Sequence, residues 1–253
     1  MPTAIVRAPS ASLADCALSF VARAPIDIER AHAQHADYED ALRELGCELI
    51  RLPAEDTLPD AVFVEDLALV FEELAIMTRP GAPSRRLESA TVEVILRRHR
   101  QIEHIKAPGT LDGGDVLRIG RTLFVGESAR SNAPAIEQLA HRLLSRAYSV
   151  RSIPTRDCLH LKSAVTEVAN GVVLINPDWV DQAAFADQVQ ILVDPDEPHA
   201  ANALRIGNRV IYPQNFPRTA TRLRAAGIDI RLVDVSELQK AEGAVTCCSL
   251  ILN

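Results

Sequence analysis

Apolar residues recur along this chain with two different periods. Short stretches rich in Val, Ile and Leu alternate with longer segments in which apolar residues recur at helical spacing, and Gly or Pro usually marks the joins. The clearest helix is expected over residues 27–45, where one face is mostly apolar and Gly46 follows as a stop. Similar patterns predict helices over residues 84–99, 131–146 and 218–226. The chain is therefore expected to be mixed α/β throughout.

Short strands are expected between these helices. They lie at residues 4–7, 48–52, 75–78, 116–119, 122–125, 172–175, 209–211 and 229–233. Gly120-Arg121 separates two of these strands, which predicts a hairpin. A succession of strand, strand, helix and strand recurs, and no linker or low-complexity tract interrupts it. We therefore expect one domain, residues 1–253, built from structural repeats whose sequences have diverged.

A doubly wound parallel sheet is the competing fold class. In such a sheet, the turn after the first strand carries a glycine-rich phosphate-binding fingerprint. The glycines of this chain form no such fingerprint after residues 4–7. The pattern therefore favours the fold built from repeats.

Composition narrows the classes of function. The chain has 253 residues, 47% of them hydrophobic, which is enough to bury a substantial core. Its formal net charge of −7 argues against nucleic-acid binding, which needs a basic footprint. The N-terminus lacks a basic region followed by an apolar one, and no apolar run reaches the roughly 18 residues that cross a membrane. We expect a cytoplasmic protein without nucleic-acid or membrane partners.

The cysteines form an odd-numbered set with no CxxC spacing. They are Cys16, Cys47, Cys158, Cys247 and Cys248. This arrangement suggests neither a disulfide framework nor a structural zinc site, so reduced thiols are expected. The open question is whether one of them is a nucleophile rather than a small buried hydrophobic residue.

Three carboxylates stand close together in an otherwise apolar stretch, residues 58–66. Asp60, Glu65 and Asp66 lie within seven residues, interleaved with apolar residues that should be buried. Acidic clusters are usually solvated loops. Carboxylates at the edge of a core, however, are costly unless a cation or hydrogen bonds satisfy them. A binding site for a guanidinium or ammonium group is therefore the alternative.

A second acidic stretch, residues 109–116, places Asp112 and Asp115 on either side of a glycine pair. The glycines permit a close or unusual backbone path, but a hairpin turn would look the same. His160 stands between leucines, where a histidine is more often a satisfied core or surface residue than a catalyst. Sequence alone leaves these alternatives open.

Cys247 and Cys248 are adjacent in an apolar C-terminal segment expected to be a strand. Neighbouring side chains in a strand point to opposite faces, so one thiol could enter the core while the other faces a cleft. A nucleophilic cysteine needs a proton donor or acceptor and a group that orients it. His160 with a carboxylate could serve, although sequence cannot show that they are adjacent in space.

Taken together, six ordered motifs closely resemble the dimethylarginine dimethylaminohydrolases, of the guanidine-modifying superfamily. They are LPDAVFVED (58–66), TRPGAPSRR (78–86), TLDGGDVL (110–117), FVGESARSN (124–132), LHLKS (159–163) and TCCS (246–249). The resemblance covers essentially the whole chain. It implies a five-bladed α/β propeller of ββαβ units with pseudo-fivefold symmetry around a central active site.

The resemblance also implies roles for individual residues. Cys247 would be the nucleophile, with Cys248 as its structural neighbour, His160 the general acid and base, and Asp112 the carboxylate that orients the histidine. Asp60 and Asp66 would bind the substrate guanidinium, with Glu65 in support. Arg85 and Arg130 would bind the α-carboxylate. The backbone carbonyls of Leu18 and Ala241 would bind the α-amino group.

The implied reaction is hydrolysis of Nω-methylated arginine, asymmetric dimethylarginine or monomethylarginine, to citrulline and a methylamine. The reaction would proceed through a covalent S-alkylthiouronium intermediate, without a metal or organic cofactor. A homodimer is possible. An arginine deiminase is the nearest rival, but deiminases typically show His-x-Asp where this chain has His160-Leu161-Lys162. A non-catalytic amino-acid binding protein is the rival from another class, and an amidinotransferase would generally be longer.

Overall fold

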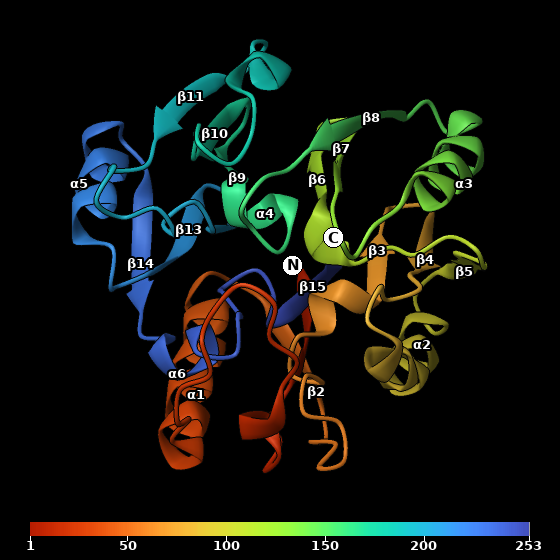
Figure 1. The fold of residues 1–253 in the computed structure, drawn as a ribbon, viewed down its shortest axis with the longest axis horizontal. Coiled ribbons are helices and arrows are strands. Elements are labelled where there is room, and N and C mark those ends of the chain that lie inside the picture. Colours follow the sequence, from red (N-terminus) through yellow and green to blue (C-terminus); the bar gives the residue numbers. More distant parts are fainter. Residues whose placement is uncertain (253) are drawn as a thin grey trace.

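The structure is a computed structural model that describes residues 1–252. Five three-stranded sheets are arranged around a common centre (Figure 1). In spatial order their strands are β15 (Ser249–Leu252), β1 (Thr3–Arg7) and β2 (Glu48–Leu52); β3 (Ala68–Val70), β4 (Leu74–Met77) and β5 (Gln101–His104); β6 (Val116–Ile119), β7 (Thr122–Glu127) and β8 (Ser149–Pro154); β9 (Val165–Ala169), β10 (Val172–Ile175) and β11 (Val189–Leu192); β12 (Leu204–Ile206), β13 (Arg209–Pro213) and β14 (Asp229–Val233).

Every sheet follows one plan. Two strands pair antiparallel, and a third then joins the middle strand in parallel, as β8 joins β7 next to β6. A parallel neighbour requires a crossover connection, and α-helices occupy four of these five crossovers. One sheet is made from both ends of the chain, because β15 pairs with β1 and Thr3 lies opposite Leu252. This pairing closes the ring and confirms the expected five-bladed α/β propeller, in which four of the five units have the ββαβ order and the fifth has a 3₁₀ turn in place of the α-helix.

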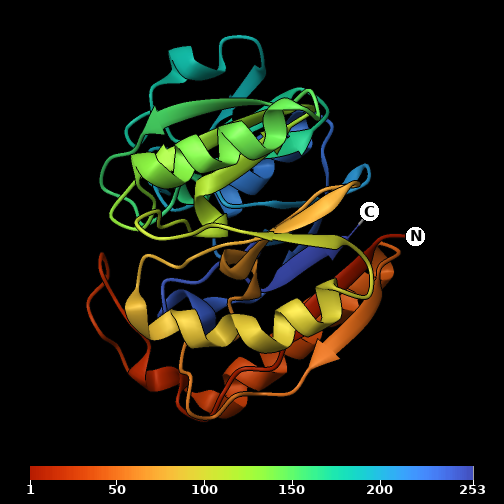
Figure 2. The same cartoon turned by 90° about the vertical axis from the view of Figure 1, so that its right-hand side faces the viewer.

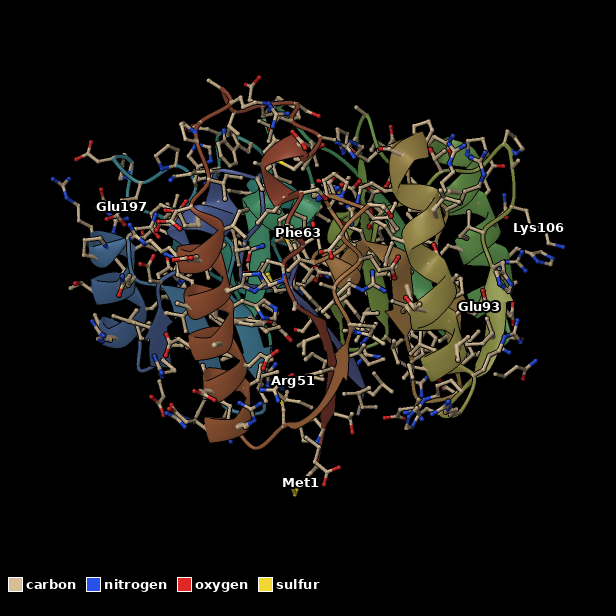
Figure 3. The ribbon with its side chains drawn as sticks, turned by 90° about the horizontal axis from the view of Figure 1, so that it is seen from below. Met1, Arg51, Phe63, Glu93, Lys106 and Glu197 are labelled. Atoms are coloured by element: carbon tan, nitrogen blue, oxygen red, sulfur yellow. The ribbon has the colours of Figure 1, made fainter. Side chains whose placement is uncertain are left out.

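The crossover helices lie on the outside of the ring. They are α1 (Ile28–Glu44), α2 (Ser89–Leu96), α3 (Ala133–Leu144) and α5 (Pro217–Ala225), while the β10–β11 crossover contains only the 3₁₀ turn η5 (Gln182–Phe185). Figure 2 shows α2 and α3 on one side of the molecule, and Figure 3 shows α1 and α2 flanking β1 and β2. No helix among residues 1–252 has the length and apolarity that a membrane crossing requires.

Helix ends follow local capping chemistry. The side chain of Asp27 accepts a hydrogen bond of 3.0 Å from the Arg30 N–H at the start of α1, and Gly46 follows its end with φ +90°. Asn132 caps α3 in the same way. The helices expected at 27–45, 131–146 and 218–226 are therefore confirmed with small shifts at their ends.

The helix expected over residues 84–99 is confirmed only over Ser89–Leu96. Residues Pro83–Glu88 form a 3₁₀ helix, η3, and α2 begins only at Ser89. In a 3₁₀ helix, side chains three residues apart lie directly above one another. This geometry lets the buried side chains of Arg85 and Glu88 pair at 2.9 Å. The tighter helix thus places a charged pair beside the centre of the ring.

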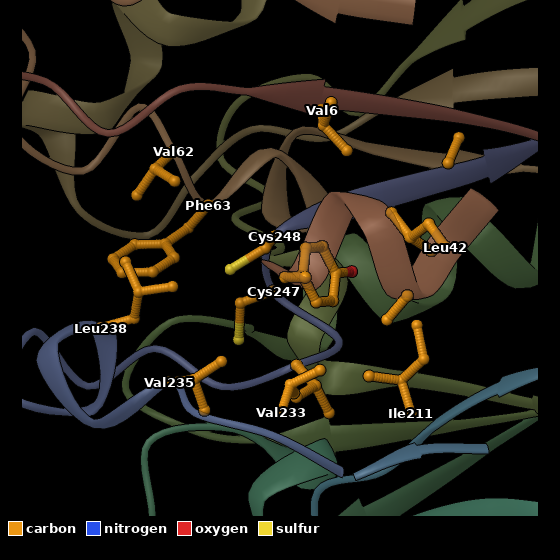
Figure 4. Close-up of a cluster of buried hydrophobic side chains, with 14 of the residues drawn as sticks. Val6, Leu42, Val62, Phe63, Ile211, Val233, Val235, Leu238, Cys247 and Cys248 are labelled. Atoms are coloured by element: carbon orange, nitrogen blue, oxygen red, sulfur yellow. The ribbon is translucent and has the colours of Figure 1, made fainter. Parts of the chain in front are cut away.

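Apolar side chains fill the spaces between neighbouring blades and beneath the helices. One cluster lies between α1, β1 and the C-terminal segment and includes Val6, Leu42, Phe63 and Leu238 (Figure 4). Four further clusters fill the other blades. Since each blade packs against the next, the loops that lead to the centre start from fixed strand ends. The centre of the ring is therefore where polar side chains from distant parts of the sequence can meet.

Candidate active site

A small cavity of about 20 Å³ lies at the centre of the ring. It is lined by Ala17, Asp60, Phe63, Asp66, Arg85, Arg130, Leu159, His160, Ala241, Glu242 and Cys247. Seven of the ten site residues expected from sequence are in this lining. The other three, Leu18, Glu65 and Asp112, lie directly behind or beside it.

His160 is positioned at the start of the four-residue helix α4 (Leu161–Ala164), in an extended backbone conformation. Its Nε2 lies 3.1 Å from Oδ2 of Asp112, and both side chains are buried. The carboxylate of Asp112 is itself fixed, because its Oδ1 accepts a 2.8 Å hydrogen bond from the Gly81 N–H. The structure therefore brings together a histidine and an acid that are 48 positions apart in sequence.

The glycine pair between Asp112 and Asp115 has a packing role. A Cβ on Gly113 would lie 2.0 Å from the Glu65 carbonyl oxygen, and one on Gly114 would lie 2.5 Å from Nδ1 of His160. Only glycine lets the backbone approach the imidazole this closely. The glycine pair therefore provides a close backbone path beside His160 and is not only a hairpin turn.

Charge and burial act in opposite directions on the pKa of His160. Burial lowers it, but the carboxylates of Asp66 and Asp112 raise it more, to about 9. Asp66 lies on the side of the imidazole opposite to Asp112, with its Oδ1 3.9 Å from Nδ1 of His160. The imidazole between these acids is therefore protonated at neutral pH and is suited to act as an acid.

Cys247 and Cys248 lie in the turn that precedes β15, so their expected place within a strand is wrong. The turn nevertheless sends the two side chains in different directions (Figure 4). Cys247 lines the cavity, whereas Cys248 is fully buried and its Sγ lies 3.5 Å from the Ala244 carbonyl. Burial, followed by the charges of Glu65 and Asp66, raises the pKa of the Cys247 thiol.

Two buried carboxylates form an acidic wall in the cavity. Oδ1 of Asp66 accepts a 2.9 Å bond from the Gly114 N–H, and its Oδ2 lies 2.5 Å from Nη1 of Arg85. Burial alone would raise the pKa of Asp66, but His160 and Arg85 lower it to about 2. Asp60 accepts a 3.2 Å bond from the Ala17 N–H, and burial raises its pKa. The two carboxylates of the wall therefore differ, because neighbouring cations and an N–H lower the pKa of Asp66, whereas burial is the largest effect on Asp60 and raises its pKa.

The two arginines expected on a substrate α-carboxylate have different surroundings. Arg85 is bonded to the carboxylates of Asp66 and Glu88 and donates to the carbonyl oxygens of Asp60 and Phe63. Arg130 donates from Nη2 to Oγ of Ser19 at 3.2 Å, and its Nη1 lies 3.8 Å from Oδ2 of Asp112. Its guanidinium is thus the less engaged of the two.

Glu65 lies behind the cavity. Its Oε1 lies 2.7 Å from Nζ of Lys162, and its Oε2 accepts a 2.7 Å bond from Oγ1 of Thr246. All three residues line a larger cavity of about 490 Å³ on the other side. The Glu65 N–H also donates to the carbonyl of Cys247 at 3.1 Å. Glu65 therefore holds the turn that carries Cys247.

Sequence reasoning missed Asp115 as part of the site. Its fully buried carboxylate accepts bonds from the Leu161 N–H and from the hydroxyls of Ser128 and Ser131, at 2.9, 2.6 and 2.7 Å. It thereby ties α4, which follows His160, to the loop that carries Arg130. The signal was present, because Asp115 is the second acid of the DGGD stretch and the serines belong to the FVGESARSN motif.

Within residues 1–252, one group of three side chains offers ligand atoms close enough for one metal ion. Asp66, Asp112 and His160 have such atoms within 4.8 Å of one another. These atoms already bond to protein groups, as His160 does to Asp112, and Asp66 to Arg85 and the Gly114 N–H. Their arrangement is therefore explained by the charges and hydrogen bonds around the imidazole.

Similarity to known proteins extends along the whole chain. The arginine deiminase family model matches residues 54–197. The chain is 39% identical over 250 residues to an N(G),N(G)-dimethylarginine dimethylaminohydrolase of Streptomyces coelicolor, covering 98% of this chain and 96% of that protein.

Two solved structures of such enzymes are also similar. A cysteine-to-serine mutant of the dimethylarginine dimethylaminohydrolase from Pseudomonas aeruginosa, in complex with citrulline, gives a TM-score of 0.95 at 34% identity, over 99% of this chain and 98% of that one. A dimethylarginine dimethylaminohydrolase with a histidine-to-glycine change, in an adduct with S-methyl-L-thiocitrulline, gives 0.95 and 34% over 100% of both chains.

Proposed function

The chain belongs to the dimethylarginine dimethylaminohydrolase family, and from this membership we propose that it hydrolyses Nω-methylated arginine to L-citrulline and a methylamine. Asymmetric dimethylarginine would release dimethylamine, and monomethylarginine would release methylamine. The observation that carries the proposal is the meeting of Cys247, His160 and Asp66 in one small buried cavity. A thiol, a protonated imidazole and an ionised carboxylate are the groups that this chemistry needs.

We propose that the guanidinium binds against the acidic wall. The ionised carboxylate of Asp66 and the carboxylate of Asp60 would accept hydrogen bonds from its nitrogens and keep it cationic. A cation beside the thiol also lowers the pKa of Cys247, opposing the effect of burial and of the nearby acids. Binding and activation are therefore linked, since the thiol becomes a better nucleophile when the substrate is present.

The first chemical step is attack of the Cys247 thiolate on the guanidinium carbon; the thiol has released its proton to solvent as the cationic substrate binds. A C–S bond forms, and the carbon becomes tetrahedral. The C–N bond to the methylated nitrogen then breaks, and His160 gives its proton to the departing amine. An S-alkylthiouronium group is left on Cys247. Asp112 would hold the imidazole in place and favour its protonated form.

The second step returns the enzyme to its starting state. His160, now neutral, takes a proton from a water molecule as the oxygen attacks the thiouronium carbon. The C–S bond breaks and the thiolate of Cys247 leaves, and the second proton of the water passes to solvent as the ureido group of citrulline forms. At the other end of the substrate, Arg130 and Arg85 would face the α-carboxylate, and the carbonyls of Leu18 and Ala241 the α-amino group.

Lys162 separates this proposal from an arginine deiminase activity. Deiminases typically have an acid two residues after the histidine, whereas this chain places an ammonium there, 2.7 Å from Glu65. An extra carboxylate for an unsubstituted guanidinium is therefore replaced by a cation.

A cytoplasmic location, a possible homodimer and a single catalytic domain over residues 1–253 remain predictions.

The test is an assay of purified protein with three substrates in parallel. Asymmetric dimethylarginine and monomethylarginine should give citrulline with one equivalent of the corresponding amine, and arginine should give much less. Citrulline and ammonia mainly from arginine would instead identify a deiminase. No citrulline from any of the three would reject hydrolysis, and calorimetric binding without turnover would indicate an amino-acid binding protein.

A further inference from the structure

The carboxylate of Glu242 collects the N–H groups of three consecutive residues from the other end of the chain. The Ser19 N–H lies 2.9 and 3.0 Å from its two oxygens, and the Val21 N–H lies 2.8 Å from Oε1. The Phe20 N–H donates to the same oxygen. Three backbone donors around one anion form a strong, charge-assisted contact. More than 220 positions separate the two partners.

The backbone of Glu242 is itself unusual. Its φ of +58° lies in the left-handed region, which residues other than glycine and asparagine rarely adopt. The Gly243 N–H donates to the Leu238 carbonyl at 3.0 Å, and a Cβ on Gly243 would lie 2.1 Å from the Phe63 ring. Packing by Phe63 therefore fixes the turn that carries this carboxylate, and the carboxylate in turn fixes residues 19–21.

The two ends of this contact lie next to the backbone groups proposed to hold the substrate α-amino group. Leu18 directly precedes Ser19, and Ala241 directly precedes Glu242. Glu242 and Ala241 both line the cavity, as does Ala17 at the other end of the contact. The hydroxyl of Ser19 also accepts the bond from Arg130. One carboxylate thus joins both carbonyls to an arginine expected on the α-carboxylate.

We propose that Glu242 is a positioning residue that holds residues 17–21 over the cavity and sets the carbonyls of Leu18 and Ala241 to receive the α-amino group. This inference rests on the proposed function. Through this contact the enzyme selects a free α-amino acid rather than any methylated guanidine. Glu242 does not touch the reacting carbon, so it acts on binding and on selectivity more than on the chemical step.

The kinetic test compares Glu242→Gly and Glu242→Gln with the unmodified enzyme. Glycine removes the carboxylate and tolerates the positive φ, so the turn is kept. KM for asymmetric dimethylarginine should rise about tenfold or more in Glu242→Gly, the effect of losing charge-assisted hydrogen bonds, while kcat falls far less. Glu242→Gln keeps one acceptor oxygen and should lie between the two. Asp56→Asn, which alters an exposed carboxylate bonded to the Ala11 N–H, should leave KM unchanged.

A substrate analogue distinguishes positioning from general loosening. The analogue of asymmetric dimethylarginine that lacks the α-amino group should show nearly the same KM in all variants. Equal increases for both compounds, an unchanged KM, or a loss confined to kcat would overturn the proposal.

Hydrogen exchange supplies a readout independent of turnover: amides 19–21 should exchange faster in Glu242→Gly while α1 keeps its protection. If the unmodified enzyme made no citrulline, the proposed function would fail, and this exchange measurement would still decide whether the contact holds the segment.

Discussion

Nε2 of His160 and Oδ2 of Asp112 lie 3.1 Å apart, with both side chains almost fully removed from solvent. The pair joins two loops from different blades of the ring. It raises the question of how much the acid contributes to the proton transfers proposed for the histidine. Burial alone would favour a neutral imidazole, so the protonated state depends on the neighbouring carboxylates.

Replacing Asp112 with Asn should therefore lower the pKa of His160 from about 9. The amide can still accept the bond from Gly81, so the fold should be kept. Because less imidazolium is available, the alkaline limb of kcat against pH should move to lower pH. At pH 8 we expect kcat to fall by about 10²-fold or more, the usual contribution of a general acid. An unchanged pH profile would show that Asp112 is only a structural partner.

The same pKa predicts how stability depends on pH. His160 binds its proton more tightly in the folded protein than in the unfolded chain, where a histidine has its ordinary pKa of 6.5. Its contribution is therefore complete below about pH 6.5 and is lost as pH rises through about 9. This difference corresponds to about 3 kcal/mol of unfolding free energy. Urea unfolding at pH 6, 8 and 9.5 should show the decline, and His160→Gln should flatten it.

How much of this molecule sequence alone predicts depends on how strongly each segment is patterned. The helix at 27–45 has a capping Asp27, a long apolar face and a terminal glycine, and it forms as α1. The strands β5, β8 and β11 were missed because their exposed, partly polar residues lack a clear apolar pattern. β3 and β12 were missed because each has only three residues.

The sequence motifs predict which residues surround the cavity better than they predict where the side chains of those residues point. The six motifs pointed to the residues around the cavity, because each motif supplies one loop end. The motifs could not show which partner each side chain has. Glu65 points away from the cavity and pairs with Lys162, and Arg85 pairs with Glu88. Such pairings depend on side chains brought together by tertiary packing. Glu242 was missed because nothing in its local sequence indicates the amides that it binds.

The two adjacent cysteines predict opposite outcomes on substitution. Cys247→Ser should abolish citrulline production, since a serine hydroxyl is a far weaker nucleophile than a thiolate in this site. Cys248→Ser should retain most of kcat, although burying a hydroxyl beside apolar groups should lower stability by about 1 kcal/mol or more. Turnover and urea unfolding of both variants give the measurement. Loss of turnover in Cys248→Ser alone would identify Cys248 as the nucleophile.

Gly114→Ala tests how closely the backbone must approach the imidazole. The added Cβ would lie 2.5 Å from Nδ1 of His160, so the ring must move away from its place beside Asp112. We expect kcat to fall by about tenfold or more, because a small misplacement of a catalytic group is costly.

A glycine far from the cavity provides the control for that change. Gly171 has φ +68° and no atom within 4 Å of an added Cβ, so Gly171→Ala strains the backbone without touching the site. It should lower stability by about 1 kcal/mol and leave kcat unchanged. Similar kcat in both variants would contradict the proposed packing role of Gly114.

Lys162 is expected to matter because it balances the buried charge of Glu65. Lys162→Met leaves that carboxylate without its cation and should lower the free energy of unfolding by about 3 kcal/mol. Since Glu65 also bonds Thr246 and the Cys247 carbonyl, kcat should fall as the nucleophile's turn loosens. Adding Glu65→Gln removes the unpaired charge, so the double variant should recover part of the lost stability. Urea unfolding of both single variants and the double variant measures this coupling, and simple additivity of the two losses would show that the pair does not act as a unit.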